Sequence, residues 1–135
     1  MINSHEVLRV WSTLPDSVKE RKACEDELLD FEDAYVVIPA EYRWFLLNCG
    51  GGAIGGEWVD GIHTLPATHD KFRHESKLEN GWKIKGFVIG WDGAGNPLVI
   101  DINGRVMVED HNNGSSFLEL FSSFSTMLKT GLKCT

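Results

Sequence analysis

Three histidines in the middle of the chain, His63, His69 and His74, are the residues that a metal site would use. Imidazole nitrogens bind zinc, and Asp70 adds a carboxylate beside the second histidine. A helical zinc pair places two histidines four residues apart, whereas these spacings are six and five. We therefore predict no metal site. A metal- or ligand-binding enzyme that uses these histidines remains the weakest of the alternatives.

A glycine-rich segment, Gly50-x-Gly52-x-x-Gly55, has the letters of a dinucleotide-binding loop. That loop must follow a strand and open a helix, so that the pyrophosphate meets the helix N-terminus. Here the glycines follow an expected helix and lead into a loop, so we expect no cofactor. Asp92 and Asn96 are spaced like the start of a calcium loop, but Ala94 lacks the oxygen ligand required between them.

Nucleophiles with a local base are not evident in the sequence. The three cysteines (Cys24, Cys49 and Cys134) are widely spaced, and acidic residues follow Cys24 and oppose its thiolate form. Asp110 and His111 are neighbours on an expected strand, where adjacent side chains point to opposite faces. No G-x-S-x-G nucleophile elbow occurs. We therefore predict no catalytic residue and a non-enzymatic protein.

Charge is distributed unevenly along the 135 residues, whose formal net charge is −7. Residues 1–60 contain twelve acids and five bases, whereas residues 61–135 contain eight of each. Such a surface repels nucleic acid and favours a basic protein partner. The candidate contacts are the acids of an expected helix and two tryptophans near loops: Glu25, Asp26, Glu27, Asp30, Glu32, Asp33, Trp58 and Trp82.

Hydrophobic periodicity predicts helices over residues 4–14, 19–35 and 39–49, with Ser4 capping the first. Short strands are expected near residues 58–59 and 87–90, with a short helix over residues 67–74 between them. A β-hairpin is expected at 97–109 around Asn103-Gly104. Ser116 and Glu119 form a capping-box pair that predicts the start of a closing C-terminal helix. These elements predict one α+β domain over residues 1–135, with a mostly antiparallel sheet.

Segments that would direct the chain to a membrane or out of the cell are not expected. No apolar run approaches the roughly 20 residues that span a bilayer. The N-terminus has no basic region followed by an apolar stretch, so we expect no signal peptide and a cytoplasmic location.

Two segments together resemble the SMI1/KNR4 (SUKH) family. Residues 38–52 are similar to its pattern of proline, acidic residue, tyrosine, Phe-Leu and a glycine pair, and residues 88–98 to its Ile-Gly and Asp-Gly turn. The resemblance covers about residues 20 to 130 in the order that the family requires. The matching positions are Pro39, Tyr42, Phe45, Leu46, Gly50, Gly51, Gly90, Asp92, Gly93, Asp110 and His111.

The resemblance implies a compact α+β domain with a groove used for protein contacts. Many bacterial members resemble immunity proteins, which bind and neutralise a cognate toxin that is often a nuclease. Eukaryotic relatives are regulatory scaffolds, so a scaffold that binds an endogenous partner is the alternative. The matching positions imply structural roles, with Asp92, Asp110 and His111 stabilising turns through side-chain to backbone hydrogen bonds.

Overall fold

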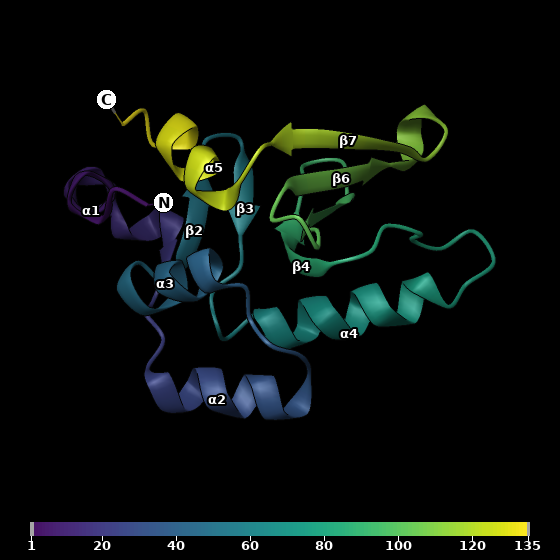
Figure 1. Cartoon of the computed structure of the whole chain (residues 1–135), viewed down its shortest axis with the longest axis horizontal. Helices are drawn as coiled ribbons and strands as arrows, with labels where there is room; N and C mark the ends of the chain where they lie inside the picture. The colour runs from purple at the N-terminus through teal and green to yellow at the C-terminus, as the bar shows by residue number, and fades with distance from the viewer. Residues whose placement is uncertain (1, 135) are drawn as a thin grey trace.

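The computed structural model describes residues 2–134 and has one antiparallel sheet flanked by helices (Figure 1). Its strands pair in sequence order, each with the next along the chain. The helices are α1 (Ser4–Thr13), α2 (Glu25–Ala34), α3 (Ala40–Asn48), α4 (Leu65–Ser76) and α5 (Phe124–Gly131). The strands are β1 (Lys19–Glu20), β2 (Gly51–Ile54), β3 (Glu57–Val59), β4 (Phe87–Trp91), β5 (Pro97–Ile100), β6 (Val106–Asp110) and β7 (Ser116–Phe121). The predicted α+β class, the hairpin and the C-terminal helix are confirmed.

The start of the predicted second helix is wrong. Lys19 and Glu20 form β1 and pair with Gly52 and Gly51 of β2, so α2 begins only at Glu25. Its N-cap is Cys24, whose backbone N–H donates to Glu27 Oε1 at 3.0 Å. Pairing with a distant strand overrides the local helical pattern of this segment.

The start of the predicted closing helix is also wrong. Residues 116–121 form β7, which pairs with β6 from Asp110↔Ser116 to Val106↔Phe121. The helix α5 begins at Phe124, where the Ser123 hydroxyl accepts from Thr126 N at 3.0 Å. α1 is likewise capped one residue earlier than predicted, because Asn3 Oδ1 accepts from Glu6 N at 3.3 Å. The capping-box pair at Ser116 and Glu119 therefore predicted a helix start that the structure lacks, because the pairing of this segment with β6 cannot be read from the sequence.

Most of the apolar side chains form one main core between the sheet and the helices. The cross-strand row Phe87↔Ile100↔Val106 turns toward this core. From α3, Tyr42 and Phe45 are fully buried in it, as their helical spacing predicts. Apolar burial on this scale is the dominant source of stability in a domain of this size.

A second, smaller cluster lies on the opposite face of the sheet. The row Val88↔Val99↔Met107 turns to that face, because adjacent residues in a strand alternate sides. Ile84, from the segment before β4, and Phe72 of α4 pack against it. The two faces are therefore closed very differently, one by several helices and the other by α4 and a short irregular segment.

Two glycines of the resemblance allow close approaches between backbone segments. Gly50 lies between α3 and β2 and has a φ of +105°. A Cβ at this position would lie 2.2 Å from the carbonyl oxygen of Glu20. A Cβ on Gly90 would lie 2.2 Å from the carbonyl oxygen of Trp58 on β3. Both positions require glycine for packing, which agrees with the predicted structural role.

In the part of the chain that the structure describes, no helix has the length and apolar character needed to cross a membrane.

Candidate protein-binding surfaces

Arginines and a backbone amide engage three of the six α2 acids. Arg43 pairs with Glu25 and lies 3.8 Å from Glu32, and Arg21 forms a bidentate pair with Glu27. Glu32 Oε2 also accepts from Ile38 N at 2.8 Å. The hydrogen bond from Arg21 lowers the pKa of Glu27 to about 2, and that from Arg43 lowers the pKa of Glu25. These three carboxylates hold α2 to its surroundings.

The other three acids, Asp26, Asp30 and Asp33, form what we call the acidic stripe. All three are exposed, and their spacing of four and three residues places them on one side of α2. Within residues 2–134 no side chain or backbone group bonds to them or pairs with them. The last turn of α2 contains no basic residue, so Asp33 also faces the negative end of the helix dipole unopposed.

A shallow hollow of about 310 Å³ adjoins this stripe. Glu27 and Asp30 are its acidic lining residues, and the others are Phe31, Ala34, Tyr35, Ile62 and Pro66. Carboxylates beside an apolar floor suit the aliphatic stem and charged end of a lysine or arginine side chain.

The two candidate tryptophans differ in exposure. Trp58 on β3 is 39 % exposed and pairs across the sheet with Trp91. Trp82 is only 9 % exposed, its Nε1–H donates to Glu75 Oε2 at 2.8 Å, and its ring centroid lies 4.0 Å from that of His111. The expectation that Trp82 is an exposed contact is therefore corrected, because its indole is buried and hydrogen-bonded within the fold.

The structure does not bring the three histidines together as a site. His69 is buried, with its ring centroid 4.5 Å from that of Phe87 and its Nε2 2.8 Å from the carbonyl oxygen of Val88. Burial lowers its pKa to about 4, so it is a neutral core residue. His63 and His74 are exposed. Among residues 2–134 no three His, Cys, Asp or Glu side chains are placed to hold a metal ion.

Two of the three predicted turn-stabilising residues act as expected. Asp92 Oδ1 accepts from Ala94 N and Asn96 N at 2.9 and 2.8 Å, and Asp110 Oδ1 accepts from Asn112 N at 3.0 Å. His111 differs, because its ring bonds to the carboxylate of Glu109 rather than to the backbone. Its backbone N–H instead donates to the Asn96 side chain at 3.2 Å.

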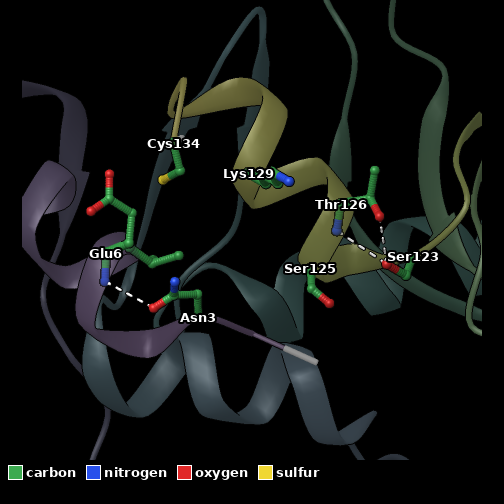
Figure 2. A pocket seen from close by; sticks show the side chains of 8 residues that line it. Asn3, Glu6, Ser123, Ser125, Thr126, Lys129 and Cys134 are labelled. Atoms are coloured by element: carbon green, nitrogen blue, oxygen red, sulfur yellow. Dashed lines mark hydrogen bonds between the residues drawn. The ribbon is translucent and has the colours of Figure 1, made fainter.

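Figure 2 shows a polar pocket between α1 and α5, with a volume of about 250 Å³. Its groups serve the fold: Asn3 and Ser123 cap the two helices, and Ser125 bonds to Glu41. Burial raises the pKa of Cys134, which lies in the same pocket, so its thiol is not activated.

A larger groove of about 710 Å³, which we call the hairpin groove, opens beside the β5–β6 turn. Its apolar lining is unusually accessible: Val36 is 48 %, Val37 74 %, Ile102 97 % and Phe117 52 % exposed. The complete lining is residues 36–37, Pro39, residues 83–87, residues 100–103, Arg105, Met107 and Phe117. Exposed apolar residues gathered around a hollow are typical of protein interaction sites.

Glu109 fixes one wall of the hairpin groove. Its side chain is fully buried, and Oε1 accepts from Lys83 N at 2.6 Å and from Ile84 N at 2.7 Å. His111 bonds to its other oxygen. Sequence reasoning missed this groove because Phe117 was assigned to a helix and Glu109 resembles a solvent-facing strand residue. The strongest signal available was Ile102, an apolar residue inside the turn sequence Asp101-Ile102-Asn103-Gly104.

The geometry defines an α+β domain with open apolar and acidic surfaces and no assembled catalytic centre among residues 2–134. Comparison with protein families gives a match to the SMI1 / KNR4 family (SUKH-1) over residues 22–130. The chain therefore belongs to the SMI1/KNR4 family, as its motifs indicated. Comparison with curated proteins gives no significant match.

Proposed function

We propose that this protein is a non-enzymatic, cytoplasmic binding domain of the immunity type, which binds a basic toxin domain and thereby neutralises it. Membership of the SMI1/KNR4 family supports a role in protein binding. The surface best suited to a basic partner is the acidic stripe on α2. Trp58 remains a candidate contact because its ring is partly exposed.

The acidic stripe is the observation that carries this proposal. Three carboxylates at positions 26, 30 and 33 repel one another along one helix face, and no ion pair among residues 2–134 includes any of them. Like charges at these spacings destabilise a helix, and an acid in the last turn opposes its dipole. This loss of helix stability is explained if the three carboxylates bind a partner outside the chain.

A basic partner would gain from the stripe in two ways. The opposite charge raises the association rate, and the hollow beside Tyr35 accepts the stem of an inserted lysine or arginine. A nuclease has a basic cleft for its substrate, so an acidic surface that covers it would also exclude the nucleic acid. This protein would then neutralise the toxin by blocking its cleft, without catalysing a reaction.

The partner would first be recovered by tagged pull-down from the native lysate, identified by mass spectrometry and eluted with rising salt. Asp30→Lys/Asp33→Lys would then be compared with Asp16→Lys/Glu79→Lys, which makes the same change of charge at exposed positions elsewhere. We expect the first pair to weaken binding of a basic toxin at least about tenfold and to restore its activity. Equal affinities of the two double variants would remove α2 from the interface.

Recovery of an endogenous metabolic or signalling protein, with no toxin, would support the alternative of a regulatory scaffold. The same two double variants would then show whether the acidic stripe contributes to that contact.

A further inference from the structure

The hairpin groove is a second open surface, whose lining shares no residue with the hollow beside the acidic stripe, although Val36 and Val37 follow the end of α2. Four apolar side chains with exposures between 48 % and 97 % surround it, and Ile102 at the turn is almost completely in water. In Figure 1 α2 lies at the lower side of the view, whereas β6 and β7, which supply Met107 and Phe117, lie at the upper side.

The charge of the groove is opposite to that of the chain. Among residues 2–134, Lys83 and Lys85 line it without an ion pair, whereas the third cation, Arg105, lies 3.8 Å from Glu119 outside the lining and pairs with the one lining acid, Asp101. That acid is already engaged, because its carboxylate accepts from Asn103 N and Arg105 N at 2.9 Å and from Arg105 Nε at 2.8 Å.

The adjoining hollow extends the same charge. It shares residues 83–86 with the groove, and Arg73 of α4 and Lys77, which follows the helix, also line it. A chain with a formal charge of −7 thus presents a locally cationic, apolar surface.

The groove is also formed in advance of any partner. The carboxylate of Glu109 holds the backbone of Lys83 and Ile84, and Asp101 closes the hairpin turn. A preformed groove loses less conformational entropy on binding than one that must first be ordered, which favours affinity.

We infer that the hairpin groove binds an acidic peptide segment that carries large aliphatic or aromatic anchor residues. The anchors would cover Val37, Ile102 and Phe117, and carboxylates on either side would meet Lys83 and Lys85. Charge complementarity selects this occupant, because a basic segment would meet uncompensated lysines. The inference does not rest on the proposed toxin contact, which uses a different surface and the opposite charge.

Selection from a random peptide library displayed on phage tests this directly, with the full chain as bait. We expect enrichment of peptides that combine Asp or Glu with Leu, Ile or Phe. Synthetic versions of the enriched peptides should bind more weakly as salt rises, because exposed charges are screened. Enrichment of basic or uncharged peptides, or no enrichment above an empty support, would overturn the inference.

Matched variants locate the binding on the protein. Lys83→Glu/Lys85→Glu should reduce the affinity of an enriched peptide at least about tenfold, whereas the control Lys22→Glu/Lys129→Glu changes the net charge equally and should leave it within about twofold. Val37→Ser/Ile102→Ser should reduce it similarly, against the control Leu29→Ser/Leu78→Ser, which removes two exposed apolar side chains outside the groove. Equal effects of test and control variants would contradict the location. Asp30→Lys/Asp33→Lys should not weaken peptide binding, which separates this result from the toxin proposal.

Discussion

The two faces of the sheet are held by different kinds of interaction. The main core is closed by apolar side chains such as Tyr42, Phe45 and Phe124, each almost completely buried. On the opposite face, within residues 2–134, the buried apolar cluster consists of Ile84, Val88 and Val99, and the carboxylate of Glu109 accepts hydrogen bonds from the segment that covers it. The first face resembles the interior of any small domain, whereas the second depends on the hydrogen bonds of one buried acidic side chain.

This difference separates the stability of the molecule from its recognition surfaces. The hairpin groove borders the second face, where residues 83–87 form its wall. A polar attachment orients a backbone segment more specifically than apolar packing does, because hydrogen bonds require defined geometry. The main core should therefore control whether the chain folds, and Glu109 should control the shape of the groove.

The largest effect is expected from Phe45→Ala in the main core. Removing a fully buried aromatic ring creates a cavity and should lower the free energy of unfolding by about 3–5 kcal/mol. Phe117→Ala, at a half-exposed ring on the second face, should lower it by less than about 1 kcal/mol. Urea denaturation followed by tryptophan fluorescence measures both. Similar losses for the two variants would mean that the faces do not differ as described.

A smaller effect is expected from Glu109→Ala, at about 2–4 kcal/mol, because the change leaves two backbone N–H groups without their acceptor. Glu109→Gln keeps an oxygen at that place and should lose less. Hydrogen exchange distinguishes this role from general destabilisation: the amides of Lys83 and Ile84 should exchange faster in the alanine variant, while those of α3 change much less. If amide exchange became faster to the same extent throughout the chain, Glu109 would contribute to overall stability and not specifically to the segment at Lys83 and Ile84.

The pH dependence of stability should come partly from His69, at the border of the main core. Its folded-state pKa of about 4 lies below its ordinary value of 6.5, so only the unfolded chain takes up the proton between these pH values. Stability is therefore present above pH 6.5 and falls as the pH falls, by about 2 kcal/mol between pH 7 and pH 5. His69→Gln, whose amide can still donate to the Val88 carbonyl, should flatten this slope in urea titrations at several pH values. An unchanged slope would assign the dependence to other groups.

Elements with strong local signals were predictable from the sequence. Pro39, the spacing of Tyr42, Phe45 and Leu46, and the glycines after them specify α3 within the chain itself. Asn103-Gly104 specifies the hairpin in the same way. Such signals need no knowledge of distant residues, and the α+β class followed from them.

The errors occurred where pairing with a distant segment decides the structure. Residues 116–121 carry apolar residues at spacings that fit a helix and a strand, and only β6 settles the choice. The same holds for β1, whose two residues are fixed by β2. The groove inherits this difficulty, because its lining comes from four separate parts of the chain. The six acids could be assigned to one helix from the sequence, but their division into three paired and three unpaired residues depends on contacts with Arg21, Arg43 and the Ile38 amide.

The smallest effect tests whether the acidic stripe is retained for a partner rather than for the fold. Asp33→Lys places a cation in the last turn of α2, where it suits the helix dipole and relieves repulsion along the stripe. Stability should rise by about 0.3–1 kcal/mol in urea denaturation, while affinity for a basic partner falls. The control Asp33→Asn should give about half of each change. If Asp33→Lys raised stability and left the affinity unchanged, Asp33 would stabilise neither the fold nor the complex. Reversal of a charge that contacts the partner must weaken binding.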